Sequence, residues 1–329
     1  MACTSTTSAC SRRTGGSISG HGGGGTVSRQ GEHVGTAPTP LRTRAPARVR
    51  VAGRRLATQV GTATAGLRVR PDFVLAGAQR CGTTSLFRAL MAHPQVVRPS
   101  FHKGVNYFDV NYERGPAWYG GHFPLRSAVS VRTARAGGPC VFEASGYYLY
   151  HPLAIERLVR ELPQVKVVVM LRDPVERAFS AWKHESARGF ETESFERALE
   201  LEPERLAGEE ERIRSDPAYQ SFAHRHQSYL HRGHYADQLD RASAVLPREQ
   251  LHVIESADFF GEPEGTFLEL TDFLGISRTL PPHFDRYNAR PGDMDPATRL
   301  RLGEYFAPHD ARLEAYLRGV PSWRDAAGA

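Results

Sequence analysis

The sequence contains few cysteines and lacks any long apolar run. Two of its four cysteines, Cys3 and Cys10, stand in a stretch of low complexity, and Cys81 and Cys140 are far apart. This number and spacing do not suit a disulfide framework and favour a reducing compartment. No stretch approaches the roughly 18 apolar residues that span a bilayer, and no apolar run of signal-peptide type opens the chain. We therefore expect a cytoplasmic protein without an integral membrane segment.

Large apolar residues are also scarce between residues 1 and 66, where Gly, Ser, Thr and Arg predominate. A segment of this composition cannot bury enough apolar surface to offset the entropy that it loses on ordering. We predict that residues 1–66 form a disordered, low-complexity basic tail and that residues 67–329 form the folded domain. The tail also has the acid-poor character of an organelle transit peptide, so organelle targeting is the alternative localisation.

Lysine is absent from the first 70 residues, and their only acid is Glu32. With eleven Arg this segment has a formal charge of +10, whereas the other 259 residues hold 31 basic and 35 acidic side chains, a formal charge of −4. The net charge of +6 and the pI of about 9.3 therefore come from the tail. Nucleic-acid-binding proteins concentrate positive charge on a folded face, so this distribution argues against a nucleic-acid partner.

Short apolar runs alternate with helical patterns from Leu67 onward. Four runs are typical of buried strands, at residues 73–76, 140–142, 165–171 and 251–254, and apolar residues at helical spacing follow them. Strands that alternate with helices form parallel βαβ units, whose ligands bind at the carboxyl ends of the strands. We predict an α/β fold of the P-loop-like, three-layer type, with a central parallel sheet flanked by helices.

The first strand runs into a turn with the sequence Gly77-Ala78-Gln79-Arg80-Cys81-Gly82-Thr83-Thr84. Its glycines have the spacing of a Walker A loop, but Thr83 stands where that motif has its lysine. Backbone amides in such a turn, together with a helix N-terminus, bind an anion, and Arg80 supplies a cation. The missing lysine argues against a kinase or NTPase. The simpler alternative is an ordinary strand-to-helix turn with a surface arginine.

A second strand-to-helix turn follows the third of these strands. Arg172 ends the strand, Asp173 and Pro174 suit the N-cap and first position of a helix, and Ser180 lies two helical turns further on. This spacing allows Arg172 and Ser180 to converge on one phosphate near the helix start. The alternative is that Arg172 pairs with Asp173 or Glu176 and that Ser180 only packs against a neighbouring helix.

The two turns together resemble the nucleotide-binding segments of a known family. Gly-Ala-Gln-Arg-Cys-Gly-Thr-Thr-Ser (77–85) and Leu-Arg-Asp-Pro-Val-Glu-Arg-Ala-Phe-Ser (171–180) are similar to the 5′-phosphosulfate and 3′-phosphate binding segments of sulfotransferases. These enzymes use 3′-phosphoadenosine 5′-phosphosulfate (PAPS), and the resemblance is greatest to the carbohydrate branch, with its heparan sulfate sulfotransferases and bacterial relatives. It extends over roughly residues 70–323, through His93-Pro94 and residues 103–118, 142–145, 233–235 and 273–275.

The resemblance implies PAPS as the co-substrate and no metal ion. The residues that would bind the 5′-phosphosulfate are Arg80, Cys81, Gly82, Thr83, Thr84 and Ser85. Arg172 and Ser180 would bind the 3′-phosphate that distinguishes PAPS from ATP. Arg286 or Arg290 would close over the nucleotide.

The resemblance also brings out differences at the catalytic positions. The family has lysine where this chain has Arg80, and arginine stabilises negative charge on the leaving oxygen but cannot donate a proton at neutral pH. Gly104 and Asn106 stand where heparan-type members have Glu and His. Both familiar bases are therefore missing from this chain.

Three nearby side chains are candidates for the general base. Glu143 leads because a strand end faces the ligand crevice, and His102 and Asp109 are the alternatives. Each also has a structural explanation: Glu143 can pair with Lys103, Asp109 can cap the next segment, and His102 can be a solvated loop residue. Lys103 is itself predicted to contact the transferring group. The predicted catalytic residues are therefore Arg80, Lys103 and Glu143.

We thus expect a sulfotransferase that moves a sulfuryl group from PAPS to a hydroxyl or amine of a carbohydrate, glycolipid or natural-product acceptor. Two alternatives stay open. The missing bases suit a catalytically silent PAPS-binding or scaffold protein, because a fold can keep its ligand site and lose its chemistry. The glycine turn suits a nucleotide or phosphoryl transferase, although no obvious set of metal-binding carboxylates accompanies it. The oligomeric state is left open.

Overall fold

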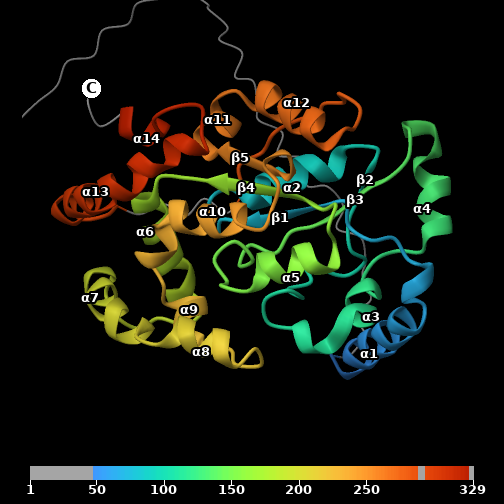
Figure 1. Ribbon diagram of the computed structural model, residues 1–329, viewed down its shortest axis with the longest axis horizontal. Coiled ribbons are helices and arrows are strands. Elements are labelled where there is room, and N and C mark those ends of the chain that lie inside the picture. Colours follow the sequence, from blue (N-terminus) through green and yellow to red (C-terminus); the bar gives the residue numbers. More distant parts are fainter. Residues whose placement is uncertain (1–46, 288–292, 326–329) are drawn as a thin grey trace, which may run out of the picture. The chain divides into compact units, whose positions relative to one another are not determined.

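The centre of the fold is a sheet of five parallel strands in the order β2-β3-β1-β4-β5 (Figure 1). The computed structural model describes residues 47–287 and 293–325. Its strands are β1 (Phe73–Gly77), β2 (Val96–Val97), β3 (Cys140–Glu143), β4 (Lys166–Leu171) and β5 (Leu251–Glu255). The predicted parallel sheet is therefore confirmed. The sequence pattern does not predict β2, because two residues carry no periodicity.

The central strands are buried on both faces. All five side-chain positions of β1 are buried, and in β4 only Lys166 at its start is partly exposed. A parallel sheet covered on both sides by helices requires such continuous apolar runs. Aromatic rings from neighbouring strands add to the core, since Phe73 of β1 stacks on Phe142 of β3 with ring centroids 4.9 Å apart.

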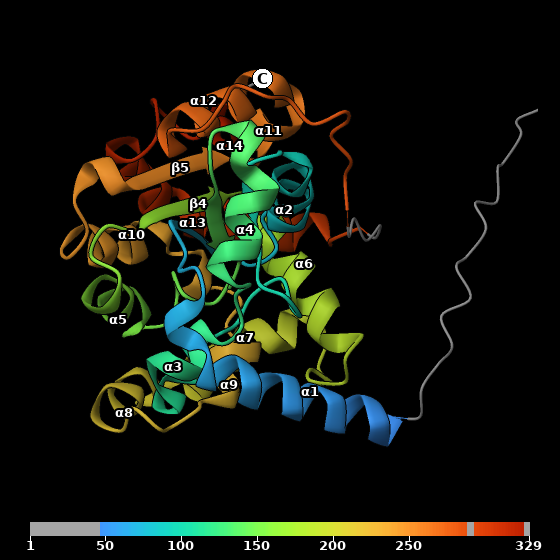
Figure 2. The ribbon, with the colours of Figure 1, turned by 90° about the vertical axis from the view of Figure 1, so that its right-hand side faces the viewer.

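Helices cover both faces of this sheet. The helices are α1 (Ala47–Ala63), α2 (Thr83–Ala92), α3 (Gly115–Gly120), α4 (Arg126–Thr133), α5 (Ala154–Glu161), α6 (Pro174–Ser186), α7 (Phe195–Leu206), α8 (Glu209–Ser215), α9 (Phe222–His226), α10 (Tyr235–Ser243), α11 (Ser256–Gly261), α12 (Pro263–Leu274), α13 (Pro296–Ala311) and α14 (Ser322–Asp325). Figures 1 and 2 show α5 and α10 on one face of the sheet and α2 and α12 on the other. This is the three-layer arrangement that the sequence predicts.

A smaller helical region, α7 to α9, extends from the end of α6 away from the sheet (Figures 1 and 2). Its first helix, α7, packs on α6 and α13 through a second apolar cluster that includes Phe179, Phe195 and Phe306. The buried carboxylate of Glu202 in α7 accepts hydrogen bonds from the backbone amides of residues 229–231, at 2.7 to 2.8 Å. This contact fixes the segment that leads into α10.

Helix α1 corrects the predicted boundary of the tail. Its residues 47–63 belong to the stretch 1–66 that composition predicts to be disordered, yet they form a helix that packs on α3. The backbones of the two segments are in close contact at Gly61 and Gly121, where a Cβ on Gly61 would lie only 2.4 Å from the carbonyl oxygen of Gly121. Local composition cannot reveal such a tertiary contact. Residues 1–46 lie outside the described residues, and for them the predicted disorder stays a prediction.

No helix in the described ranges is both long enough and apolar enough to cross a membrane. The two cysteines of these ranges, Cys81 and Cys140, are buried free thiols.

Candidate active site

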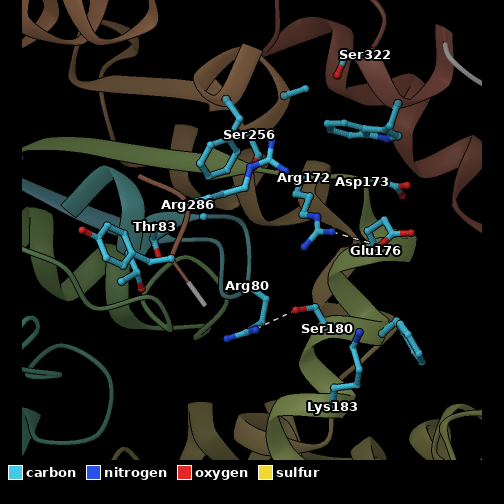
Figure 3. A pocket seen from close by; sticks show the side chains of 17 residues that line it. Arg80, Thr83, Arg172, Asp173, Glu176, Ser180, Lys183, Ser256, Arg286 and Ser322 are labelled. Carbon is cyan, nitrogen blue, oxygen red and sulfur yellow. Dashed lines mark hydrogen bonds and ion pairs between the residues drawn. The ribbon is translucent and has the colours of Figure 1, made fainter. Parts of the chain in front are cut away.

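A cleft of about 530 Å³ opens at the carboxyl ends of β1, β4 and β5 (Figure 3). The segments that follow these strands all contribute to its wall: residues 80–84 after β1, residues 172–183 after β4 and residues 256–260 after β5. Arg286, Tyr287, Ser322 and Trp323 complete the lining. The position agrees with the rule that parallel α/β sheets bind ligands beyond the carboxyl ends of their strands.

The turn after β1 presents backbone amides to this cleft. Helix α2 begins at Thr83, and its N-cap is Gly82, with φ of 91°. This φ favours glycine, and a Cβ on Gly82 would also lie a tight 3.0 Å from the ring of Phe260. The first amides of a helix have no partner within the helix, and the helix dipole adds positive potential at this end. The turn is therefore suited to binding an anion, as its sequence predicts.

The turn after β4 places a second cation in the same cleft. The carboxylate of Asp173 caps α6 by accepting from the amide of Val175 at 2.8 Å, and Pro174 occupies the first helical position. Arg172 and Ser180 both line the cleft. The Arg172 guanidinium also pairs with Glu176 at 3.3 Å, as the alternative prediction proposed, with 37% of the arginine side chain exposed. Exposed pairs of this kind are weak, so the pair does not prevent Arg172 from binding a phosphate.

The two turns are joined directly. Arg80 Nε donates a hydrogen bond to the hydroxyl of Ser180 at 3.1 Å, and Figure 3 shows the two side chains meeting across the cleft. Beneath the cleft, the hydroxyl of Tyr235 donates to the carbonyl of Arg172 at 2.9 Å and lies 3.5 Å from the Cys81 sulfur. Helix α10 thus fixes the relative position of the two turns.

Two predicted cofactor residues turn away from the cleft. Cys81 is fully buried, burial raises the pKa of its thiol, and the residue is not part of the cleft lining. Ser85 is also buried, and its hydroxyl accepts from the amide of Tyr287 at 3.0 Å. The role of Ser85 in the described structure is therefore to hold the segment of Arg286 and Tyr287 against α2. Arg286 itself lines the cleft, with its guanidinium 4.3 Å from the centre of the Phe260 ring.

Arg290, the other residue predicted to close over the nucleotide, lies outside the described residues.

The side chain of Lys103 contacts the first residues of α2. Its ammonium donates to the hydroxyls of both Thr83 and Thr84, at 3.3 Å each, and lies over the ring of Phe87. Burial lowers the pKa of Lys103 to about 8. Lys103 is not itself among the residues that line the cleft, but it contacts Thr83 and Thr84, which are.

Glu143 does not face the cleft. It is fully buried, and four donors surround its carboxylate at 2.7 to 3.0 Å: the amide of Val105 and the hydroxyls of Ser145, Tyr119 and Tyr148. Burial raises the pKa of this carboxyl group despite these donors. The contacts tie together the segments around residues 105, 119 and 145–148. This is a structural role, and the geometry does not support the prediction that Glu143 is the base.

The two alternative bases are also outside the lining of the cleft. His102 is exposed. Asp109 is buried and lines a separate cavity of about 380 Å³, and burial raises its pKa to about 7. One of its oxygens accepts from the amide of the adjacent Val110 at 2.6 Å, and the N-cap of the following 3-10 helix is Asn111, so the alternative in which Asp109 caps the next segment is not supported.

The structure explains why residue 104 carries no side chain. A Cβ at Gly104 would lie 2.3 Å from the carbonyl oxygen of Ala144 and 2.6 Å from the hydroxyl of Ser145. The residues that follow β3 fill the space that a side chain at position 104 would occupy. A glutamate is therefore sterically incompatible with this position.

This close packing makes Gly104→Ala strongly destabilising. We expect a loss of about 1–3 kcal/mol, because overpacking against backbone forces the chain apart. Thermal unfolding measures it, with Gly265→Ala as the matched control, since a Cβ at Gly265 meets nothing within 4 Å. An unchanged melting temperature in Gly104→Ala would contradict the packing described here.

The structure adds cleft residues that sequence reasoning did not select. Lys183 lies one helical turn after Ser180, so a helical projection of α6 would have predicted it. Phe260 and Trp323 had no such signal, because they reach the cleft from segments far along the chain.

Comparison with known proteins identifies the family. Residues 70–290 match the sulfotransferase domain family. The membrane-associated sulfotransferase kil1 of Dictyostelium discoideum is 26% identical over 321 residues, which cover 78% of this chain and 67% of that protein. The human bifunctional heparan sulfate N-deacetylase/N-sulfotransferase 2 is 27% identical over 77% of this chain, but the match covers only 30% of that protein.

Among solved structures, a sulfotransferase from Alicyclobacillus acidocaldarius is similar to this chain. The two are 34% identical, with a TM-score of 0.56, and the match covers 78% of this chain and 99% of the other. The family match spans more than half of the sequence and includes both turns that line the cleft. The chain therefore belongs to the sulfotransferase domain family and is a sulfotransferase.

Proposed function

We propose that this enzyme transfers a sulfuryl group from PAPS to a hydroxyl or amine of a carbohydrate, glycolipid or natural-product acceptor. The observation that carries the proposal is the meeting of two anion-binding turns in one cleft, where Arg80 from the first contacts Ser180 from the second at 3.1 Å. Two separated anionic groups on one nucleotide require such a pair of turns. PAPS carries them as a 5′-phosphosulfate and a 3′-phosphate.

The 5′-phosphosulfate is assigned to the turn after β1. The amides at the start of α2, the hydroxyls of Thr83 and Thr84 and the guanidinium of Arg80 supply donors there. The 3′-phosphate is assigned to Arg172 and Ser180, whose donors suit a phosphate group. Phe260 and Arg286 both line the cleft and stack on each other, and we assign them to cover the nucleotide.

The chemistry divides between Arg80 and Lys103. The acceptor oxygen or nitrogen attacks sulfur and releases its proton to water, the bond from sulfur to the bridging phosphate oxygen breaks, and negative charge develops on that oxygen. Arg80 stabilises this charge but keeps its protons. Lys103, with a pKa of about 8, is able to donate a proton to the leaving oxygen. We assign electrostatic stabilisation to Arg80 and proton donation to Lys103.

A carbohydrate acceptor is favoured by the relatives. Several matching proteins are named as heparan sulfate N-sulfotransferases, which points to an acceptor with sugar hydroxyls or amines. These matches are 26 to 28% identical, so the proposal extends to the acceptor class and not to one sugar.

The cofactor assignment predicts dependence on the 3′-phosphate. In calorimetric titrations of the full chain, we expect 3′,5′-ADP, the desulfated product, to bind more tightly than 5′-AMP or ATP. Arg172→Ala should weaken 3′,5′-ADP binding by about 10- to 100-fold, because a hydrogen bond to a charged group contributes about 1.5–3 kcal/mol. Binding of 5′-AMP should change little, so the preference for the 3′-phosphate should shrink.

Arg278→Ala is the matched control, because Arg278 is exposed and pairs with Asp272 on the surface. Its affinity for 3′,5′-ADP should equal that of the parent chain. A preference for ATP with Mg²⁺ would sink the proposal and favour a phosphoryl transferase. Turnover is then tested by release of 3′,5′-ADP from PAPS with sugar, lipid and small-molecule acceptors.

A further inference from the structure

A cluster of metal-ligating side chains lies between α10 and α13. His234 immediately precedes α10, Asp237 is in its first turn, and His309 is near the end of α13. One nitrogen from each histidine and one oxygen of Asp237 all lie within 4.8 Å of one another. None of these residues lines the cleft described above.

The distance between His234 and Asp237 suits a shared ion better than a direct contact. His234 Nδ1 is 3.9 Å from Asp237 Oδ2, which is too long for a hydrogen bond. Two ligands that each lie about 2.0–2.2 Å from a tetrahedral zinc ion are separated by a little less than this distance. The His309 ring stacks on the His234 ring, with centroids 3.8 Å apart and planes inclined by 8°. The His309 ring would have to rotate out of this stack for its nitrogen to reach the same ion.

Neighbouring groups orient these ligands. His234 Nε2 hydrogen-bonds the hydroxyl of Tyr305 at 2.9 Å, which leaves Nδ1 on the side of Asp237. The other oxygen of Asp237 pairs with Arg312, which also contacts Asp240. Metal-binding histidines and carboxylates are commonly held in this way by hydrogen bonds from outside the metal's own ligand set.

We propose that His234, Asp237 and His309 bind a divalent transition-metal ion of the zinc type. Two imidazoles and one carboxylate match the ligand preference of zinc and cobalt, whereas calcium and magnesium prefer sites made of oxygen alone. Three protein ligands leave the fourth position to water.

The site would join two helices that support the cofactor cleft. On one side, Tyr235, next to His234, donates to the carbonyl of Arg172. On the other side, Arg299 of α13 pairs with Glu176, the partner of Arg172. Because the ligands themselves are outside the cleft, the ion has a structural function, and its removal lowers thermal stability without removing a catalytic group.

The test is metal titration of the full chain. Cys3→Ser and Cys10→Ser are introduced first, because thiols in residues 1–46 would bind zinc. After chelator treatment, we expect Zn²⁺ to raise the melting temperature and Co²⁺ to give the visible bands of a tetrahedral site. His309→Ala and Asp237→Asn should each lose one bound equivalent, the Co²⁺ bands and the Zn²⁺-dependent shift. Their affinity for 3′,5′-ADP should be unchanged.

The matched control is His283→Ala, because His283 is an exposed histidine that also has an aspartate partner, Asp285. It should keep the metal stoichiometry and spectrum of the parent. The proposal is overturned when the parent binds no Zn²⁺ beyond the His309→Ala variant, or when both give the same Co²⁺ spectrum. Asp237→Asn preserves side-chain size, so its result separates loss of a ligand from loss of fold.

Discussion

Replacing Lys103 with methionine is expected to lower kcat for sulfuryl transfer by about 10²- to 10³-fold, the usual effect of removing one group that stabilises developing charge. The reason is its position, 3.3 Å from the hydroxyls of Thr83 and Thr84 at the start of α2. Methionine keeps the length and apolar character of the buried stem and removes the charge and the proton. Binding of 3′,5′-ADP, measured beside kcat, shows whether the site stays folded.

The pH profile distinguishes a proton donor from a simple cation. Burial lowers the pKa of Lys103 to about 8, so the protonated form is lost as the pH rises through this value. kcat/KM for PAPS, which reports the free enzyme, should therefore fall above pH about 8. The alkaline decrease of kcat should lie at higher pH than that of kcat/KM, because the bound phosphosulfate favours the charged ammonium of Lys103.

Lys103→Arg provides the decisive comparison. Arginine stays charged across this range but cannot donate a proton, so the variant should be slower than the parent and should lack the alkaline limb. An alkaline limb that persists near pH 8 in Lys103→Arg would assign it to another group. The chain has only three lysines, Lys103, Lys166 and Lys183, which keeps the number of alternatives small.

Mild acid is expected to destabilise the fold because two histidines are buried as neutral rings. His224 lies against Tyr147 and Tyr150, with its Nδ1 2.7 Å from the Tyr147 hydroxyl, and His151 packs edge-on against Tyr147. Burial, with nearby arginines second, lowers the pKa of His224 to about 2 and that of His151 to about 3. Both residues are 5% exposed or less.

The sign follows from proton binding. Both folded pKa values lie below the ordinary value of 6.5, so well above pH 6.5 the folded and unfolded states bind equally few protons and the stability is complete. As the pH falls from 6.5 toward 3, the two histidines bind protons in the unfolded state but stay neutral in the folded state. Each histidine then costs about 1.4 kcal/mol per pH unit, and the pair costs about 3 kcal/mol at pH 5.5.

Thermal unfolding at pH 7.5 and pH 5.5 measures this effect. The share of these two histidines, about 3 kcal/mol, corresponds to a fall of roughly 6–12 °C in Tm for a domain of this size. His224→Phe keeps a ring on Tyr150 and cannot titrate, so its loss of stability between the two pH values should be smaller than that of the parent by the share of one histidine, about 1.4 kcal/mol. His283→Phe, at an exposed site, should behave as the parent does. An equal fall in His224→Phe and the parent would exclude His224 as a source of acid sensitivity.

The parts of the site that the sequence predicted are the ones built by local rules. The glycines of the first turn and the Asp173-Pro174 start of α6 specify where each helix begins, and a helix start brings its amides and neighbouring cations with it. Arg80, Arg172 and Ser180 therefore reach the cleft as predicted. Their common position follows from the sheet order, since β1 and β4 are adjacent parallel strands.

The burial and hydrogen-bond partners of Glu143 could not be predicted from local sequence. A carboxylate at a strand end suggests a base, and the sequence has no sign of the four donors that converge on it from residues 105 to 148. Which residues would bury Glu143 depends on how three distant segments meet. The same limit applies to Lys103, whose contact with α2 was predicted only in outline and whose pKa depends on burial that no motif encodes.

The sequence by itself determined the alternation of strands and helices, the two anion-binding turns and the family, because each rests on side-chain pattern and backbone preference within a short stretch. Tertiary structure alone decided that Glu143 is structural, that Gly104 leaves no room for a base, and that α1 packs through Gly61. Burial, close approach and hydrogen-bond partners arise between segments distant in the chain. They appear only when the fold has brought those segments together.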